Sequence, residues 1–225
     1  MKALRQIMRI GLPADIQNAV FAVSNIVIQS AINSFGKVVM AASSAAYNIE
    51  IFAYDVMNSF SQACTTFVGQ NYGAKQIDRC KKTLALCLIE DATATATAMI
   101  LVLLAGRYML AVFNNDPEVI EIGYTRLKMV FFSYIFSMLY DVMSGYLRGF
   151  GISLAPAILT TIGVCGVRIA WIKLVFPNDP TFHTIMTAYP LSLSFMALLI
   201  FTALICCRPA KRNAEKFKDK NTANT

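Results

Sequence analysis

Charged side chains are scarce in this sequence. Only 15% of its 225 residues are Asp, Glu, Lys or Arg, whereas 56% are hydrophobic, and the mean hydropathy is +0.54. A typical soluble domain carries charge on about a quarter of its residues. The composition therefore excludes an ordinary soluble protein and favours a chain that lies mostly within a lipid bilayer.

The residues that carry most enzyme chemistry are also few. His183 is the single histidine, and the sequence contains no His-Glu-x-x-His or Gly-x-Ser-x-Gly pattern and no phosphate-binding loop. Its six cysteines show no paired metal-ligand spacing. We therefore expect neither an enzyme nor a protein that holds a cofactor.

Six apolar windows each reach the length of about 20 residues that a helix needs to span hydrocarbon. The windows, rich in Leu, Ile, Val, Ala, Phe and Met, run over residues 12–32, 38–68, 84–104, 127–150, 154–176 and 185–207. We therefore predict an all-α membrane protein in which residues 1–207 form one bundle of six transmembrane helices. No soluble domain of any size fits between these windows.

Basic residues predict the orientation of this bundle. Most of the 20 lysines and arginines lie at one predicted end: Lys2, Arg5, Arg9, Lys75, Arg79, Lys81, Lys82, Arg148, Arg208, Lys211, Arg212, Lys216, Lys218 and Lys220. Positive charge marks the cytoplasmic side of a membrane. We therefore expect both termini in the cytoplasm and the chain in the cell membrane.

The same distribution bears on what the chain binds. The basic residues that give the net charge of +7 lie mostly at the predicted cytoplasmic end, where the predicted topology requires them. Nucleic acid is therefore not an expected partner. The basic, polar segment 208–225 is expected to be a disordered cytoplasmic tail that contacts anionic lipid.

Three carboxylates fall near the middle of a predicted span: Glu50, Asp55 and Asp141. A charged side chain at bilayer depth costs several kcal/mol, so such residues usually face a wet cavity or a partner and often belong to an ion path. We predict that these three couple ion movement to transport.

Polar residues recur at helical spacing around the carboxylates, and they predict a common polar interior. The candidate lining residues are Asn18, Asn25 and Gln29 in the first window, Tyr47, Tyr54 and Asn58 in the second, and Tyr134, Ser137 and Ser144 in the fourth. Hydrogen bonding between helices is the alternative for the Ser and Asn residues.

Three other features concern helix packing. Gly145 and Gly149 form a Gly-x-x-x-Gly pattern, which predicts close contact with a neighbouring helix. Pro190 falls inside the sixth window and predicts a kink. Arg168, inside the fifth window, is expected to reach the interface or to pair with a carboxylate, for which Asp141 is the candidate.

Three blocks of sequence carry a specific resemblance. Residues 67–74 read Phe-Val-Gly-Gln-Asn-Tyr-Gly-Ala, residues 148–153 read Arg-Gly-Phe-Gly-Ile-Ser, and residues 11–14 read Gly-Leu-Pro-Ala. With these blocks in this order, the sequence resembles the multidrug and toxic compound extrusion (MATE) family, in particular its bacterial members. The resemblance covers nearly the whole chain.

The resemblance implies a secondary antiporter that exports drugs or other amphipathic, often cationic compounds in exchange for protons or sodium ions. Family members have twelve helices in two similar halves, and this chain matches the C-terminal half. A six-helix N-terminal half is therefore an expected partner. The chain is then a fragment of a longer product, a product of an internal start, or one of two separately made halves.

The resemblance also bears on the ion site. In one branch of the family, carboxylates on the first and fourth helices of the C-terminal half bind the cation. Asp141 lies near the expected position on the fourth helix, whereas the first helix has Ser24 and Asn25 in mid-span. Glu50 or Asp55 is the candidate replacement. If the coupling ion is sodium, it is expected at Asp141 and Glu50.

Two alternatives stay open. A lipid-linked oligosaccharide flippase of the same wider superfamily would use a similar two-lobed cavity, although the Gly-Gln-Asn-Tyr-Gly-Ala block at 69–74 disfavours it. A non-functional fragment is the other.

Overall fold

The computed structural model describes the backbone of residues 2–222 and the side chains of residues 4, 8, 11–13 and 15–215. The described chain is helical and contains no strand. Its elements are α1 (Lys2–Asn33), α2 (Lys37–Gly73), α3 (Ile77–Ala111), α4 (Pro117–Gly149), α5 (Leu154–Thr160), the π-helix η1 (Thr161–Gly166), α6 (Val167–Leu174), α7 (Phe182–Cys207) and α8 (Pro209–Thr222). The all-α prediction is confirmed.

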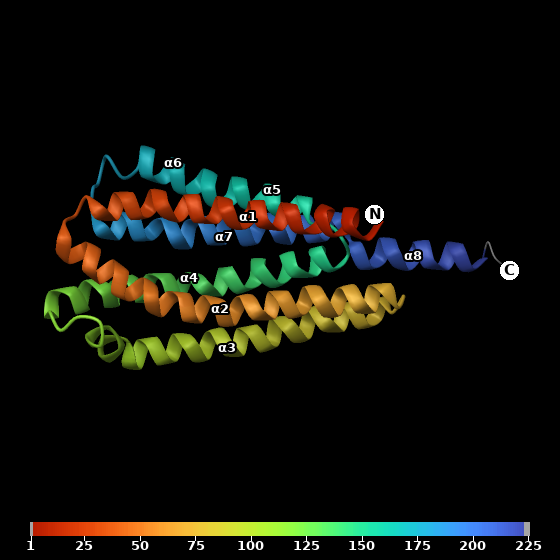
Figure 1. The fold of residues 1–225 in the computed structure, drawn as a ribbon, viewed down its shortest axis with the longest axis horizontal. Coiled ribbons are helices and arrows are strands. Elements are labelled where there is room, and N and C mark those ends of the chain that lie inside the picture. Colours follow the sequence, from red (N-terminus) through yellow and green to blue (C-terminus); the bar gives the residue numbers. More distant parts are fainter. Residues whose placement is uncertain (1, 223–225) are drawn as a thin grey trace.

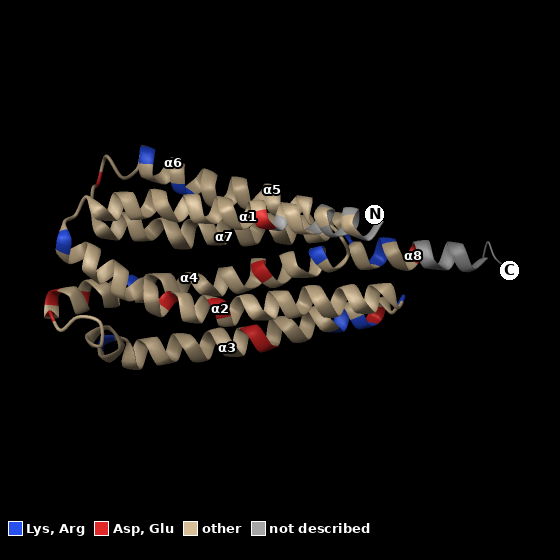
Figure 2. Cartoon of the chain, in the orientation of Figure 1, with Lys and Arg blue, Asp and Glu red and all other residues tan. Residues whose placement is uncertain are grey.

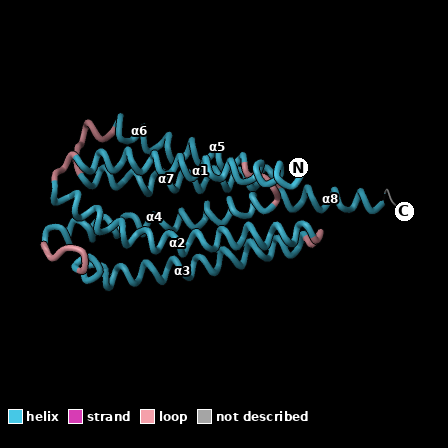
Figure 3. The backbone as a smooth tube through the Cα atoms, viewed as in Figure 1, coloured by secondary structure: helices cyan, strands magenta, loops and turns pink. Residues whose placement is uncertain are grey.

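The long helices run side by side and are joined by short turns (Figures 1 and 3). α5, η1 and α6 follow one another without a break and form what we call the fifth rod, residues 154–174. α4 is central, because it packs against α2, α3 and α7. α1 packs mainly against the fifth rod and makes fewer contacts with α2 and α7.

Local chemistry explains where two of the helices begin. Asp116 precedes α4, and its Oδ1 accepts a hydrogen bond from the backbone N–H of Glu118 at 2.9 Å. Pro117 occupies the first turn of α4, where a missing N–H costs little. Thr181 caps α7 in the same manner, because its Oγ1 accepts from the N–H of Thr184 at 3.2 Å.

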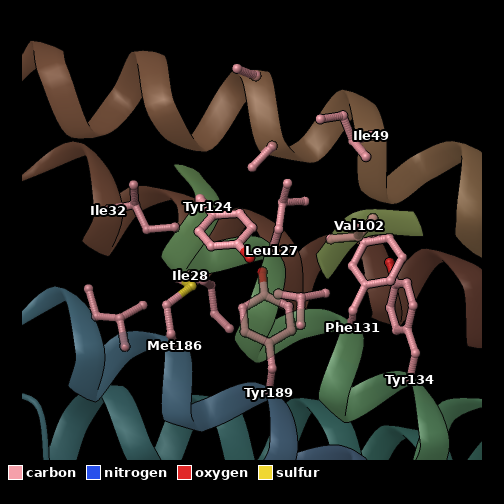
Figure 4. Packing of buried hydrophobic residues seen from close by; sticks show 14 of the residues in the cluster. Ile28, Ile32, Ile49, Val102, Tyr124, Leu127, Phe131, Tyr134, Met186 and Tyr189 are labelled. Atoms are coloured by element: carbon pink, nitrogen blue, oxygen red, sulfur yellow. The ribbon is translucent and has the colours of Figure 1, made fainter. Parts of the chain in front are cut away.

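A hydrophobic core joins α1, α2, α3, α4 and α7 near one end of the bundle. Figure 4 shows Ile28, Ile49 and Val102 from α1, α2 and α3 converging on Leu127 of α4 and Tyr189 of α7. Burying each large aliphatic side chain is worth about 1.5–3 kcal/mol in water, and in a bilayer the tight packing itself takes over part of this role. This core fixes the position of α1 and α7 relative to α4.

The predicted close packing at the two α4 glycines is confirmed. A Cβ atom on Gly145 would lie 2.5 Å from the carbonyl oxygen of Ser61, and one on Gly149 would lie 2.6 Å from the Cβ of Val68. The hydroxyl groups of Ser61 and Thr65 donate hydrogen bonds to the carbonyl oxygens of Asp141 (2.7 Å) and Gly145 (3.1 Å). α2 and α4 therefore meet backbone to backbone.

Four helical segments in the described part of the chain are long and apolar enough to cross a membrane. They are Ile77–Ala111, Pro117–Gly149, Leu154–Leu174 and Phe182–Glu215. α1 and α2 have the length, but the Asn, Gln and carboxylate side chains in their windows reduce their hydropathy. The count of six spans is not confirmed by this criterion and stays a prediction.

The tail differs from the expectation of disorder. Residues 209–222 form helix α8, which begins with Pro209 directly after Arg208, a residue in the left-handed conformation (φ 38°). Ala210 and Ala214 of α8 pack on the core near α2 and α3, and Tyr72 donates a hydrogen bond to Asn213 at 3.2 Å. These contacts order the start of a segment whose composition alone suggested a solvated coil.

Candidate functional site: two adjoining polar cavities

A large cavity, about 950 Å³, lies between α1, α2, α4 and α7, with one residue of α6 in its wall. It forms where α1 leans on the fifth rod and leaves space on its side toward α2. Its wall mixes Asn and Gln from α1 with tyrosines from α2, α4 and α7. A wall of this kind offers hydrogen bonds and ring faces together, which suits amphipathic ligands.

A smaller cavity of about 270 Å³ adjoins the large one and contains Asp141. Four residues of α1 and α2 belong to both walls, so the two cavities adjoin there: Asn18, Phe21, Tyr54 and Asn58. The small cavity also contains Asp15 of α1 and Arg148 of α4.

Most residues predicted to line a polar interior lie on these walls. They are Asn18, Asn25, Gln29, Tyr47, Tyr54, Asn58, Tyr134 and Ser137. Ser144 lines neither cavity, because it lies where α4 is covered on every side, and its side chain is fully buried. Asp55 also lines neither cavity and is exposed on α2.

Asp141 is 6% exposed, and its Oδ2 accepts a hydrogen bond from Ser137 Oγ at 3.3 Å. Within the described residues no Lys or Arg nitrogen lies within 4.0 Å of this carboxylate. Arg148, in the same small cavity, instead donates to Ser61 Oγ at 3.0 Å. The Asp141 carboxyl group therefore lies against a cavity with no ion-pair partner, an arrangement that suits proton or cation binding.

Glu50 is in a different situation, because Arg126 holds both of its oxygens. Arg126 Nε donates to Oε1 at 2.7 Å and Nη2 donates to Oε2 at 2.8 Å, and the two residues are 4% and 2% exposed. Tyr134 adds a hydrogen bond to the backbone oxygen of Glu50 at 3.2 Å. The structure thus places Glu50 in a buried ion pair at the large cavity, apart from Asp141 in the small one.

Arg126 was not among the residues that the sequence predicted at the polar interior. Its signal was present: Arg126, Val130 and Tyr134 are spaced by four residues and continue the α4 stripe that leads to Asp141. The hypothesis that Arg168 pairs with Asp141 is wrong. Arg168 instead donates to Ser192 Oγ at 3.1 Å and to Asn25 Oδ1 at 2.8 Å.

A polar cavity enclosed by long, largely apolar helices defines a helical, multi-pass membrane protein with room for a solute. The chain belongs to the MatE family, because the MatE family model matches residues 13–172. This assignment agrees with the resemblance carried by the three sequence blocks.

Two relatives show how much of a family member this chain represents. It is 26% identical over 165 residues to the probable multidrug resistance protein NorM of Thermotoga maritima. The aligned segment covers 73% of this chain and 36% of the relative. It is also 22% identical over 197 residues to the probable multidrug resistance protein YoeA of Bacillus subtilis. That aligned segment covers 87% of this chain and 42% of the relative. The chain thus spans less than half the length of either relative.

A solved structure supports the same fold. A crystal structure of MATE in complex with MaL6 superposes with a TM-score of 0.82 at 13% identity, over 97% of this chain and 48% of that chain. The matching family is one of transporters rather than enzymes, and the flippase alternative is not favoured.

Proposed function

We propose that this chain is the C-terminal, six-helix half of a secondary antiporter that exports drugs or other amphipathic, often cationic compounds in exchange for protons or sodium ions. The observation that carries the proposal is Asp141, a buried carboxyl group with no ion-pair partner among the described residues, at a cavity that adjoins a much larger one. The names of the two bacterial relatives as probable multidrug resistance proteins support the substrate class.

The proposed mechanism is alternating access. A proton or a sodium ion binds at Asp141 while the cavities are open outward, and it biases the helices toward release of the exported compound. Both cavity walls contain Asn18, Tyr54 and Asn58. Ion binding at Asp141 therefore affects the large cavity through these three side chains.

The exposed face of α2 supports a second half as partner. Asp55 is exposed there, next to residues that line the cavities, and a lipid-facing surface would not favour its carboxylate. A preceding six-helix half that covers this face would give Asp55 a polar environment. α1 and α2 would then join the four apolar segments as membrane spans, despite their lower hydropathy, and bring the number of spans in this half to six.

The experiment uses inverted membrane vesicles from the source cells, so that any second half is present. Dye transport is followed after a proton or a sodium gradient is imposed. Wild-type vesicles are expected to transport dye with one of the two gradients, and Asp141→Asn is expected to reduce this to the level of vesicles that lack the chain. The protein level in the membrane should stay unchanged.

Glu90→Gln is the matched control, because Glu90 is exposed on α3 and lines neither cavity. It should transport as the wild type does. Normal gradient-driven transport by Asp141→Asn would rule out the coupling role, and wild-type transport that ignores both gradients would overturn the antiporter. A wild-type chain without any effect on transport would indicate a non-functional fragment.

A further inference from the structure

The large cavity carries an excess of positive charge. Its charged lining residues are Glu50, Arg126 and Arg168, whereas Asp141 lines only the small cavity. Glu50 is neutralised by Arg126, to which both of its oxygens are hydrogen-bonded. The charge of Arg168 is therefore left without compensation in a cavity whose expected ligands are cationic.

Arg168 is buried at this cavity and has no carboxylate partner among the described residues. Its side chain is 1% exposed and is held by neutral oxygens, those of Ser192 and Asn25. No carboxylate of the described chain lies within 4.0 Å of it. An arginine stays protonated in proteins, and a buried charge without a counter-ion is costly, so an anion that reaches this guanidinium gains a strong interaction.

Arg126 supplies an independent observation at the same cavity. Its Nη1 is buried and has no hydrogen-bond partner in the described part of the chain, although the residue is only 2% exposed and lies in the cavity wall. Buried donors are normally satisfied, so an unpaired one beside a cavity points to a ligand that accepts from it. The two arginines share a neighbour, because the Tyr189 ring lies 4.6 Å from the Arg168 guanidinium and 6.0 Å from that of Arg126.

We propose that Arg168, together with the free donor of Arg126, binds the carboxylate of an amphipathic aromatic compound in the large cavity. The rings of Phe21, Tyr47 and Tyr189 line the same cavity and provide faces for the aromatic body. Guanidinium groups match carboxylates in shape and charge, and such hydrogen bonds are about twice as strong as neutral ones. That the chain exports this compound rests on the proposed function, whereas the binding of the compound in the cavity does not.

Binding is measured by equilibrium dialysis of the purified full chain in lipid nanodiscs, with empty nanodiscs to subtract partition into lipid. The probes are 1-naphthoate, neutral 1-naphthylmethanol and cationic 1-naphthylmethylammonium, which share one ring system. We expect wild-type protein to bind naphthoate at least about tenfold more tightly than either of the others, since one charge-assisted contact is worth this factor.

Two variants locate the site. Arg168→Gln should remove the preference for naphthoate and leave naphthylmethanol binding within about twofold, because only the charged contact is lost. Asn25→Asp keeps Arg168 and places a carboxylate beside its Nη1, at the position now 2.8 Å away, so the preference should also disappear. Lys173→Gln is the matched control, because Lys173 is exposed on the same helix and should not change binding.

The outcomes separate this proposal from the proposed function. Equal binding of naphthoate by the wild type and both variants, or tighter binding of the ammonium probe by the wild type, would overturn the carboxylate subsite. Should Arg168→Gln fail to fold, Asn25→Asp alone decides. Loss of gradient-driven dye transport in vesicles would count against the antiporter and leave a positive naphthoate result standing.

Discussion

At the scale of single residues, the ion pair between Glu50 and Arg126 links α2 to α4 and also forms part of the wall of the large cavity. Glu50→Gln keeps the side-chain shape but leaves the Arg126 charge buried without a counter-ion. Removing one partner of a buried pair costs about 3–5 kcal/mol. We therefore expect a lower unfolding temperature for the purified variant, measured by circular dichroism in detergent.

A double replacement tests the reason for this loss. Glu50→Met combined with Arg126→Met removes both charges and fills similar volume, so it should recover most of the lost stability. Glu90→Gln, on the exposed side of α3, should unfold as the wild type does. An unchanged unfolding temperature for Glu50→Gln would show that the pair is not a stabilising element.

The sequence predicted the cavity residues better than their partners. Asp141 and Glu50 stand out because carboxylates are rare within apolar windows, whereas the pairing of Glu50 depends on how α2 and α4 are rotated against each other. Asp55 shows the same limit, since it lies on the exposed part of α2 despite its similar sequence context. Glu90 and Asp91 are neighbours in the sequence, yet Glu90 is exposed and Asp91 is fully buried, because adjacent helical residues point about 100° apart.

At the scale of helices, the α2–α4 contact depends on the absence of two side chains. Gly145→Ala would place a methyl group 2.5 Å from the backbone oxygen of Ser61, which cannot move without displacing α2. Overpacking of this kind costs about 1–3 kcal/mol. We expect a lower unfolding temperature for Gly145→Ala, and also for Gly149→Ala, which would meet the Val68 side chain at 2.6 Å.

Gly73→Ala is the matched control, because a Cβ atom there would meet nothing within 4 Å. As alanine favours helix, this variant should be as stable as the wild type or slightly more stable. If Gly145→Ala and Gly73→Ala unfolded at the same temperature, α2 and α4 would not approach each other as closely as the structure has it.

Helix positions followed from the apolar windows, since each window lies largely inside a helix or the fifth rod. The helices extend beyond several windows, for example to Ile77 and Ala111 in α3, because helical hydrogen bonding continues past the apolar stretch. The π-helix η1 could not be predicted. It lies where Gly163 packs on Met196 of α7, so closely that a Cβ atom on the glycine would lie only 2.9 Å from the sulfur, and such a tertiary contact leaves no periodic signal.

At the scale of the whole molecule, the charges separate the two ends of the bundle. The end that holds the N-terminal part of α1, the α2–α3 turn and α8 carries most of the basic side chains of the described residues (Figure 2). Fewer basic residues lie toward the opposite end, among them Lys37 and Arg107, and Arg107 is paired with Glu121 at 2.6 Å. This asymmetry is the physical basis for expecting both termini in the cytoplasm.

Reporter fusions test that orientation. Alkaline phosphatase is active only outside the cytoplasm, where its disulfides form, whereas green fluorescent protein fluoresces when it folds inside. Fusion after residue 225 should give fluorescence and no phosphatase activity, and fusion after Asn114, in the turn between α3 and α4, should give the reverse. Replacing Lys75, Arg79, Lys81 and Lys82 with Gln removes much of the bias and should yield mixed signals at both sites. Phosphatase activity of the wild-type fusion after residue 225 would contradict the orientation, and equal signals at the two sites would contradict an odd number of membrane crossings between them.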